Sequence, residues 1–581
     1  MTDQRTEHAP WPMRAALLFG LGALCGLAFD LLTRGDAGTS WSVTESIPRL
    51  SLATLIATGG VLFAFTLERV RWTWSLAFAA CAGAVLALIF YWNASPVSRS
   101  ADDVWRAFAA LLAVAIAAPL FQTMRDEGAR RLPYVPVHAH AWANVVIWCA
   151  AWAFVLIAWL LVQLLAELFQ LIGITVLREL LDKSWANWML VGGTLGAAVG
   201  LLRDRDRVVG LLQRVVTTIL SVLAPVLAAG LVLFELALPF TGLDRLWDQT
   251  RATTPILLTC VFGAFILANA VIGTGPDEEA KNPVLRWSAM ALGAAMLPLV
   301  VVAAISTGLR IGQYGFTPER LWAVVFVAIA AACALLYLYA LIRARTAWAG
   351  RIRPANIRLA IGICIAALLL ATPLADFGAI SVRSQLARLE SGAVTPAEFD
   401  WRALRFDFGP SGVAALERLK AEGANPEIRR LATAALAAEH RHELASGEDR
   451  RLALRQNLRV LPEGAQIPPA LREIVLRGRR CADHGACLLI MDPAANRAVL
   501  VNTDYCGGIF PGPNTCEPMA GAYYLSGSEW VNTPPRPPGG ESAEARHARL
   551  DAAVRQGRVE IRAVPRRQVF VDGQPVGDAF E

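Results

Sequence analysis

The chain has 581 residues, of which 55% are hydrophobic and 18% are charged, and its mean hydropathy is +0.45. This profile excludes an ordinary soluble protein. Residues 1–376 contain 28 Lys and Arg against 23 Asp and Glu, whereas the remainder contains 26 against 25. The near-neutral C-terminal part shows no basic face, so we expect no nucleic-acid partner.

Eleven apolar stretches in residues 1–376 predict a mainly α-helical, polytopic transmembrane bundle. Each is long enough to cross about 30 Å of hydrocarbon, which takes roughly 20 residues in a helix whose backbone hydrogen bonds close internally. The first lacks a signal-peptide cleavage site, so we expect an uncleaved span. Trp72, Trp92 and Trp322 lie at span ends, as in interfacial belts. The predicted spans are Met13 to Thr33, Leu50 to Leu67, Trp72 to Trp92, Val104 to Gln122, Trp142 to Leu165, Trp185 to Leu202, Val215 to Leu236, Thr253 to Ile272, Arg286 to Ser306, Glu319 to Ile342 and Ile357 to Asp376.

Basic residues in the connections predict the orientation, because Lys and Arg collect on the cytoplasmic side. With a cytoplasmic N-terminus, 18 of the 28 basic residues of the first part lie inside and ten outside. A second crossing between Trp142 and Leu177 would reverse this bias, so we predict one crossing there. The remainder, LLAELFQLIGITVLRELL, then reads as an amphipathic segment on the outer surface. An odd number of spans places the C-terminus in the periplasm.

The C-terminal part divides by periodicity into a helical segment, residues 377–461, and a small β-rich domain, residues 462–581. Thr395 to Glu398 is a capping-box pattern, and Asn425 with Pro426 predicts a second helix start. The runs ACLLIMD, RAVLVN, GAYYLS, VEIRAV and RQVFV predict strands. Asp572 and Gly573 follow VFV and predict a two-residue hairpin, whereas residues 532–544 predict an exposed loop.

Two segments that follow the last span point to a family. The sequence RSQLARLESGAVTPAEFD and the stretch FDWRALRFDFGPSGVAALERL, which ends at residue 419, resemble bacterial inner-membrane proteins grouped as domain of unknown function 4153. The resemblance covers most of the chain, and ALRFDFG is its most specific piece. It implies an integral inner-membrane protein without an established activity and brings no catalytic or binding residues.

Four cysteines lie close together in the predicted periplasmic domain, where disulfides form and persist. We favour two bridges, Cys481 with Cys487 and Cys506 with Cys516, among the three pairings that four cysteines permit. A zinc site formed by Cys481, His484, Cys487 and a further cysteine is the alternative. The oxidising compartment and the absence of paired C-x-x-C motifs favour disulfides. The other six cysteines are scattered through the spans, where cysteine behaves as a small hydrophobic residue.

Ionisable residues and prolines within the spans are the intramembrane candidates. Glu167 and Glu235 lie at the predicted outer ends of spans five and seven, where interfacial anchoring competes with a substrate-binding function. Pro225 and Pro298 fall near the middle of spans seven and nine and can kink them. A midplane site at these prolines is the basis of a transporter hypothesis.

Acidic and histidine residues in the connections give weaker indications. Asp102 and Asp103 in a predicted outer loop suggest a membrane transferase, but a short loop offers little material for a pocket, and solvated charges are favoured. His138 and His140 fall in a predicted inner loop without a partner carboxylate at a meaningful spacing. The tail contains no G-x-S-x-G, H-E-x-x-H or P-loop motif.

Together these patterns predict a multi-pass protein of the bacterial inner membrane that is not an enzyme. We expect it to present a disulfide-stapled periplasmic domain to a protein partner of the envelope, with the lipid bilayer as its other partner and with no cofactor or metal ion. A transporter or permease with a site at Pro225 and Pro298 is the first alternative. An envelope-facing membrane transferase is the second.

Overall fold

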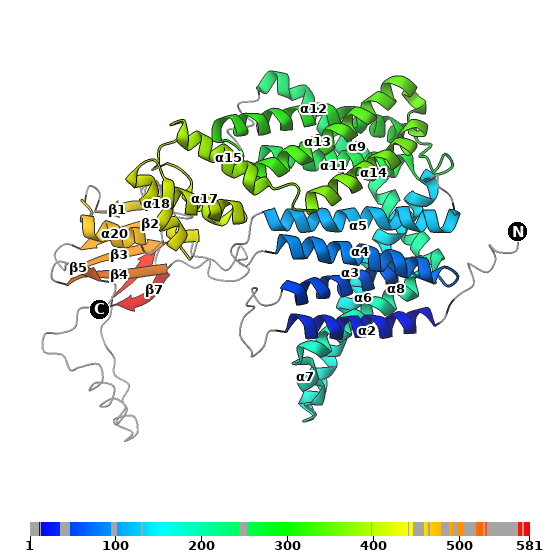
Figure 1. Ribbon diagram of the computed structural model, residues 1–581, viewed down its shortest axis with the longest axis horizontal. Helices are drawn as coiled ribbons and strands as arrows, with labels where there is room; N and C mark the ends of the chain where they lie inside the picture. Colours follow the sequence, from blue (N-terminus) through cyan, green and yellow to red (C-terminus); the bar gives the residue numbers. More distant parts are fainter. Residues whose placement is uncertain are drawn as a thin grey trace, which may run out of the picture. The chain divides into compact units, whose positions relative to one another are not determined.

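The computed structural model describes residues 11, 13–34, 47–94, 102–128, 132–242, 252–396, 398–439, 441–444, 458–462, 465–477, 487–492, 497–502, 519–526, 529–531, 567–571 and 574–580. The chain forms two compact units, Met1–Ala437 and Ala438–Glu581. The first is helical and the second contains the strands (Figure 1). The expected three-part division at residues 376 and 461 stays a prediction.

The first unit contains the membrane bundle. Eleven of its described helices are long and apolar enough to cross a membrane, which confirms the predicted polytopic helical class. The helices are α2 (Arg14–Thr33), α3 (Ile47–Thr66), α4 (Trp72–Asn93), α5 (Asp102–Glu127), α6 (Tyr134–Leu171), α7 (Val176–Leu181), α8 (Ser184–Arg203), α9 (Asp206–Thr241), α11 (Thr253–Ile272), α12 (Pro283–Tyr314), α13 (Pro318–Ala344), the 3₁₀ helix η2 (Arg345–Ala347), α14 (Ala349–Ala371), α15 (Phe377–Glu390), α16 (Trp401–Phe406), α17 (Gly409–Glu422) and α18 (Pro426–Ala437).

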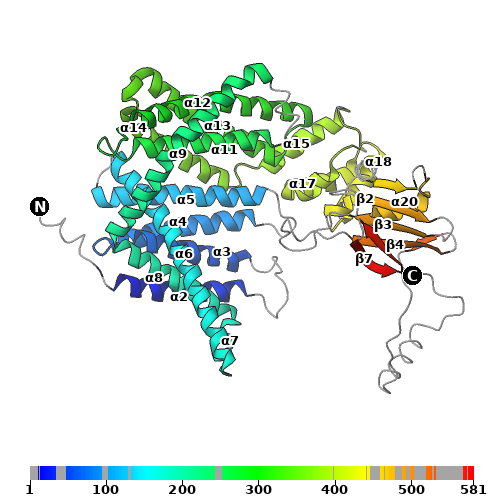
Figure 2. The same ribbon diagram turned by 180° about the vertical axis from the view of Figure 1, so that it is seen from behind.

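The first half of the bundle is built on a very close crossing between α2 and α8. Helices α2, α3, α4 and α5 follow one another side by side, and α8 lies against α2 (Figure 2). A Cβ atom built on Gly196 would lie 2.0 Å from the carbonyl oxygen of Leu18, and one built on Gly22 would lie 2.0 Å from that of Gly192. Only glycine permits this approach, as in other close contacts between membrane helices.

The second half of the bundle packs α9, α11, α12 and α13 around one large apolar cluster. Leu292, Met296 and Leu299 of α12 are fully buried in it. Helix α14 joins this half to the first by lying along α5. Helices α9 and α12 continue unbroken through Pro225 and Pro298, so neither proline ends or unwinds its helix.

Helix α6 differs from its prediction at both ends. It begins at Tyr134 instead of Trp142 and runs without a break to Leu171. Its 38 residues span about 57 Å at the rise of an α-helix. Residues 166–171, predicted to lie on the outer surface, therefore continue the helix, and α7 alone forms a separate short helix after the turn.

Of the two helix starts predicted after the last span, one is confirmed and the other lies at a different residue. Glu398 Oε2 accepts the capping-box hydrogen bond from the backbone N–H of Thr395 at 3.3 Å and a second bond from Thr395 Oγ1 at 2.8 Å, but only a turn follows. Helix α16 begins at Trp401, because Asp400 Oδ1 accepts from the backbone N–H of Ala403 at 2.9 Å. The predicted start at Asn425 is confirmed, since its Oδ1 accepts from the Ile428 N–H at 2.8 Å.

The second unit is a small sheet domain with its own apolar core. Strands β1 (Leu458–Leu461), β2 (Cys487–Asp492), β3 (Arg497–Asn502), β4 (Met519–Ser526) and β5 (Glu529–Val531) form a sheet in sequence order, while β6 (Arg567–Val571) and β7 (Gln574–Phe580) form a separate antiparallel pair. Only β1 and β2 are parallel within the five-stranded sheet.

One face of this sheet is covered by helix α20 (Pro469–Arg477). Leu471 and Val475 of the helix pack with Leu489 and Leu500 of the sheet, and Val499 faces the other side because strand side chains alternate. Residues 458–461 form a strand, so the predicted helical segment does not extend to 461. The 3₁₀ helix η3 (Arg441–Leu444) precedes the strands. The hairpin prediction is confirmed by the antiparallel pairing of Val571 with Gln574, whereas VEIRAV and residues 532–544 lie outside the described residues.

Candidate functional site

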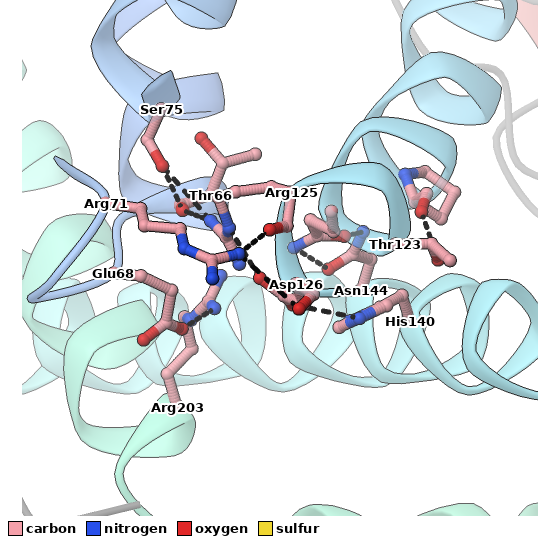
Figure 3. Close-up of polar contacts among 12 residues, drawn as sticks. Thr66, Glu68, Arg71, Ser75, Thr123, Arg125, Asp126, His140, Asn144 and Arg203 are labelled. Carbon is pink, nitrogen blue, oxygen red and sulfur yellow. Dashed lines mark hydrogen bonds and ion pairs between the residues drawn. The ribbon is translucent and has the colours of Figure 1, made fainter. Parts of the chain in front are cut away.

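Charged side chains gather where the ends of α2, α5 and α8 meet the connection between α3 and α4. Figure 3 shows the part of this group that comes from α5, α8 and the connection. We call this group the arginine cluster; its members are Arg14, Glu68, Arg71, Arg125, Asp126, Arg203 and Asp204. Each lies within the first or last turn of a membrane helix or in the chain directly beside it. Figure 3 shows the side chains of Arg71, Arg125 and Arg203 converging from three different elements.

Arg125 is the most deeply buried cation of the arginine cluster, with 1% of its side chain exposed. Its Nε donates to Asp126 Oδ1 at 2.6 Å, and its Nη1 donates to Ser75 Oγ at 3.1 Å and to the carbonyl oxygen of Thr66. Arg71 in turn donates to the carbonyl oxygen of Arg125. These bonds satisfy carbonyl groups at the C-terminal ends of α3 and α5, where no helical N–H is available.

A second set of ion pairs in the cluster centres on Glu68. Its two carboxylate oxygens pair with Arg203 at 2.6 Å and with Arg14 at 3.3 Å. Arg14 also lies 3.3 Å from Asp204, so that one guanidinium joins the start of α2 to the end of α8. Burial raises the pKa of the Asp204 carboxyl above its usual value, although the Arg14 guanidinium acts in the opposite direction.

Helix α6 contributes polar side chains to the same region. His140 Nε2 lies 3.3 Å from Asp126 Oδ2, and Asn144 Nδ2 donates to Gln122 Oε1 at 2.8 Å (Figure 3). The sequence prediction that His138 and His140 lie in a loop without a partner carboxylate is therefore wrong for His140. The two histidines lie on a helix, and the carboxylate comes from α5, only 14 residues earlier in the chain.

Two donors of the arginine cluster have no acceptor among the residues that the structure describes. They are Arg125 Nη2 and Arg14 Nε, and both atoms are buried. The cluster also contains four guanidinium groups and three carboxylates, so its charges do not balance. An arrangement with spare buried N–H groups and surplus positive charge has the chemistry to hold an anion.

A buried clasp at the opposite end of the bundle contains Asp102, which the sequence suggested as a solvated loop residue. Asp102 lies in the first turn of α5 and is 2% exposed. It accepts hydrogen bonds from Arg106 Nε at 2.7 Å and from Trp322 Nε1. Trp322 is accordingly buried, whereas Trp72 is exposed on the bundle surface as an interfacial residue would be. We call this group the Asp102 clasp; it ties α5 to α13, so the prediction of a solvated loop charge at Asp102 is wrong, while the transferase alternative stays a prediction.

A ring of three hydrogen bonds joins α11, α13 and α14 inside the second half. Asn269 Nδ2 donates to Tyr337 Oη at 2.6 Å, Tyr337 Oη donates to Asn356 Oδ1 at 3.3 Å, and Asn356 Nδ2 donates to Asn269 Oδ1 at 2.7 Å. Tyr337 is fully buried. This Asn–Tyr ring was not predicted, because its members lie on three helices and carry no charge that would mark them in an apolar sequence.

The predicted intramembrane residues lie apart from the arginine cluster. Glu167 is mostly exposed near the end of α6 and pairs with Arg178 of α7 at 2.5 Å. Glu235 lies on α9, and its buried Oε1 has no hydrogen-bond partner among the described residues. Pro225 is half-buried and Pro298 is exposed on the bundle surface. The structure therefore does not bring these four residues together as one site.

Of the four C-terminal cysteines, only Cys487 lies among the described residues. It is buried on β2, and it is not one of the six free thiols of the membrane helices. Cys481, Cys506, Cys516 and His484 lie outside the described residues. Within the described ranges, no three His, Cys, Asp or Glu side chains gather as metal ligands.

Comparison with known proteins gives one match. The family model described as Domain of unknown function (DUF4153) matches residues 52–419, more than half of the chain. The matched range includes the membrane helices from α3 onward and ends within α17. No curated protein and no solved structure matches the chain.

Proposed function

The chain belongs to the DUF4153 family of multi-span membrane proteins of unknown function, and from this premise we propose that its bundle anchors a periplasmic sheet domain in the inner membrane. In this proposal the bundle presents residues 438–581 to a protein partner of the envelope and performs no chemistry itself.

The observation that carries the proposal is the independence of the second unit. Its sheet and α20 enclose a core of their own, with Leu471, Leu489 and Leu500 fully buried. The family match ends at residue 419, before this unit begins. A separately folded module appended to a membrane bundle fits a role in recognition by that module.

Charge and cysteine chemistry support the periplasmic location. The excess of basic residues in alternate connections favours a cytoplasmic N-terminus, and an odd number of spans then exports the C-terminal unit. Disulfides persist in that compartment. Cys487, a buried cysteine that is not a free thiol, supports the proposed stapling of this unit together with Cys481, Cys506 and Cys516.

Two measurements on the full chain test the proposal. A periplasm-active reporter fused after Glu581 is expected to be active, and Cys487 is expected to resist alkylation until a reductant is added. A photo-crosslinking amino acid at exposed Gln466 is expected to give a discrete adduct in cells, whereas the same group at exposed Glu422 is not. A reporter that is active only in the cytosol, or equal labelling from both positions, would refute the proposal.

A permease is the second candidate, and the isolated carboxylate of Glu235 favours it. Glu235 is half-buried in a membrane helix, and its buried Oε1 has no hydrogen-bond partner among the described residues, so it is a candidate for carrying a proton. Proton entry into liposomes that contain the purified chain, driven by a potassium diffusion potential, would be lost in Glu235→Gln. If the variant matches the wild type, Glu235 has no part in transport.

A further inference from the structure

We propose that the arginine cluster is a binding site for one phosphate group, carried either by an anionic lipid headgroup or by a free phosphate compound. The inference does not depend on the function proposed for the second unit or on the side of the membrane that the cluster faces.

The first argument is charge. Arg14, Arg125 and Arg203 have at most 10% of their side chains exposed. Among the described residues of the cluster, three carboxylates match these three guanidinium groups, and Arg71, which is half-buried, is the surplus cation. Water hydrates the charge of a half-buried guanidinium only in part, so a counter-ion beside Arg71 is favourable. One bound anion would compensate the surplus.

The second argument is the set of unused donors. Arg125 Nη2 and Arg14 Nε are buried and have no acceptor in the part of the chain that the structure describes. The remaining donors of Arg125 are held by Asp126, Ser75 and Thr66, so its guanidinium is fixed in orientation before any ligand arrives. A planar guanidinium presents N–H groups in the geometry that phosphate oxygens accept.

The third argument is the position of the cluster. Arg14 begins α2, Arg125 lies in the last turn of α5, and Arg203 ends α8, so the guanidinium groups lie at the ends of three membrane spans. The polar headgroup region of a bilayer flanks its hydrocarbon layer at this depth. Phosphate is the anionic group that both headgroups and water-soluble metabolites bring to such a surface.

Native mass spectrometry of the delipidated full chain tests the inference and separates the two ligand sources. Phosphatidylglycerol is compared with a galactosyl diacylglycerol of the same acyl chains, which lacks phosphate. Inorganic phosphate is compared with potassium chloride at equal ionic strength by thermal unfolding. We expect one tightly bound phosphatidylglycerol, or a phosphate-specific rise in melting temperature, and each result assigns the corresponding source.

Arg125→Gln is the decisive variant, with Arg178→Gln as the control because Arg178 forms an exposed ion pair far along the chain. We expect the dissociation constant for the effective ligand to rise at least tenfold in Arg125→Gln and less than twofold in Arg178→Gln. If Arg125→Gln does not fold, Arg14→Gln takes its place, since it removes the other unused donor. Equal binding of both lipids together with no phosphate-specific stabilisation of the wild type would overturn the inference. An unchanged affinity in the folded variant would overturn it as well.

Discussion

Replacement of Gly196 by alanine tests the close crossing of α2 and α8 that organises the first half of the bundle. The new methyl carbon would lie 2.0 Å from the carbonyl oxygen and 2.7 Å from the carbonyl carbon of Leu18, and ordinary van der Waals contact begins at 3.4 Å. The obstructing atoms belong to the backbone of a helix, so no rotamer change relieves the clash. The helices must separate by more than about 1 Å, which loses contact along their interface.

Overpacking of this kind costs about 1–3 kcal/mol and sometimes more. For a large domain this corresponds to a fall in melting temperature on the order of 5 °C. Thermal unfolding of the detergent-solubilised chain, followed by fluorescence-detected size-exclusion chromatography, measures the fall. Gly20→Ala is the control, because Gly20 lies on α2, the other helix of the crossing, and a Cβ atom there meets nothing within 4 Å. Equal melting temperatures for the two variants would refute the crossing.

Three further substitutions test the other joints of the molecule. Asp102→Asn leaves the guanidinium of Arg106 without its carboxylate partner, and we expect the free energy of unfolding to fall by about 3–5 kcal/mol in a denaturation assay. In the same assay, Glu167→Gln at an exposed ion pair should change the free energy of unfolding by less than about 1 kcal/mol. Tyr337→Phe breaks the Asn–Tyr ring and should lower the free energy of unfolding by about 0.6–1.7 kcal/mol. The control Tyr339→Phe, at an exposed tyrosine, should leave it unchanged. Leu489→Ala should destabilise the second unit by about 2–5 kcal/mol. Limited proteolysis should then cleave residues 438–581 faster and leave the bundle intact. An unchanged rate of cleavage would contradict a separate core in the second unit.

The membrane spans were predictable because the bilayer imposes one requirement on every crossing helix. About 20 apolar residues are needed whatever the function, and each predicted span corresponds to a described helix. The ends were less predictable, as α6 shows. Its first turns contain His138 and His140, which read as a polar connection in the sequence. They lie on the helix, where α5 supplies Asp126 as the partner of His140.

The helix start predicted at Thr395 was wrong because a second helix-capping residue, Asp400, follows it closely. The capping box at Thr395 forms its hydrogen bond, but Asp400 caps the backbone five residues later and starts α16 there. Trp401 Nε1 also donates to the carbonyl oxygen of Pro396 at 2.8 Å, which holds the intervening residues as a turn. A sequence pattern cannot rank two adequate caps, because burial of Trp401 and Leu404 decides between them.

The arginine cluster was not predicted, because its members come from separate segments. Residues that contact one another between these segments lie far apart in the sequence. Glu68 and Arg203 are 135 residues apart, and Arg125 and Ser75 are 50 apart. Each residue alone is a charge beside a span, which the positive-inside tendency already explains. Only the fold reveals that these charges are buried and that they face one another.

Comparison of the polar joints indicates why the arginine cluster does more than hold helices together. Helix association in a bilayer gains little from the hydrophobic effect, so small residues and hydrogen bonds carry it. The Asn–Tyr ring meets that need with neutral groups, and the Asp102 clasp meets it by pairing Asp102 with Arg106. A structural joint of either kind needs no surplus charge. The arginine cluster retains an additional cation and two unused buried donors, which would weaken a joint but suit a site that an anion completes.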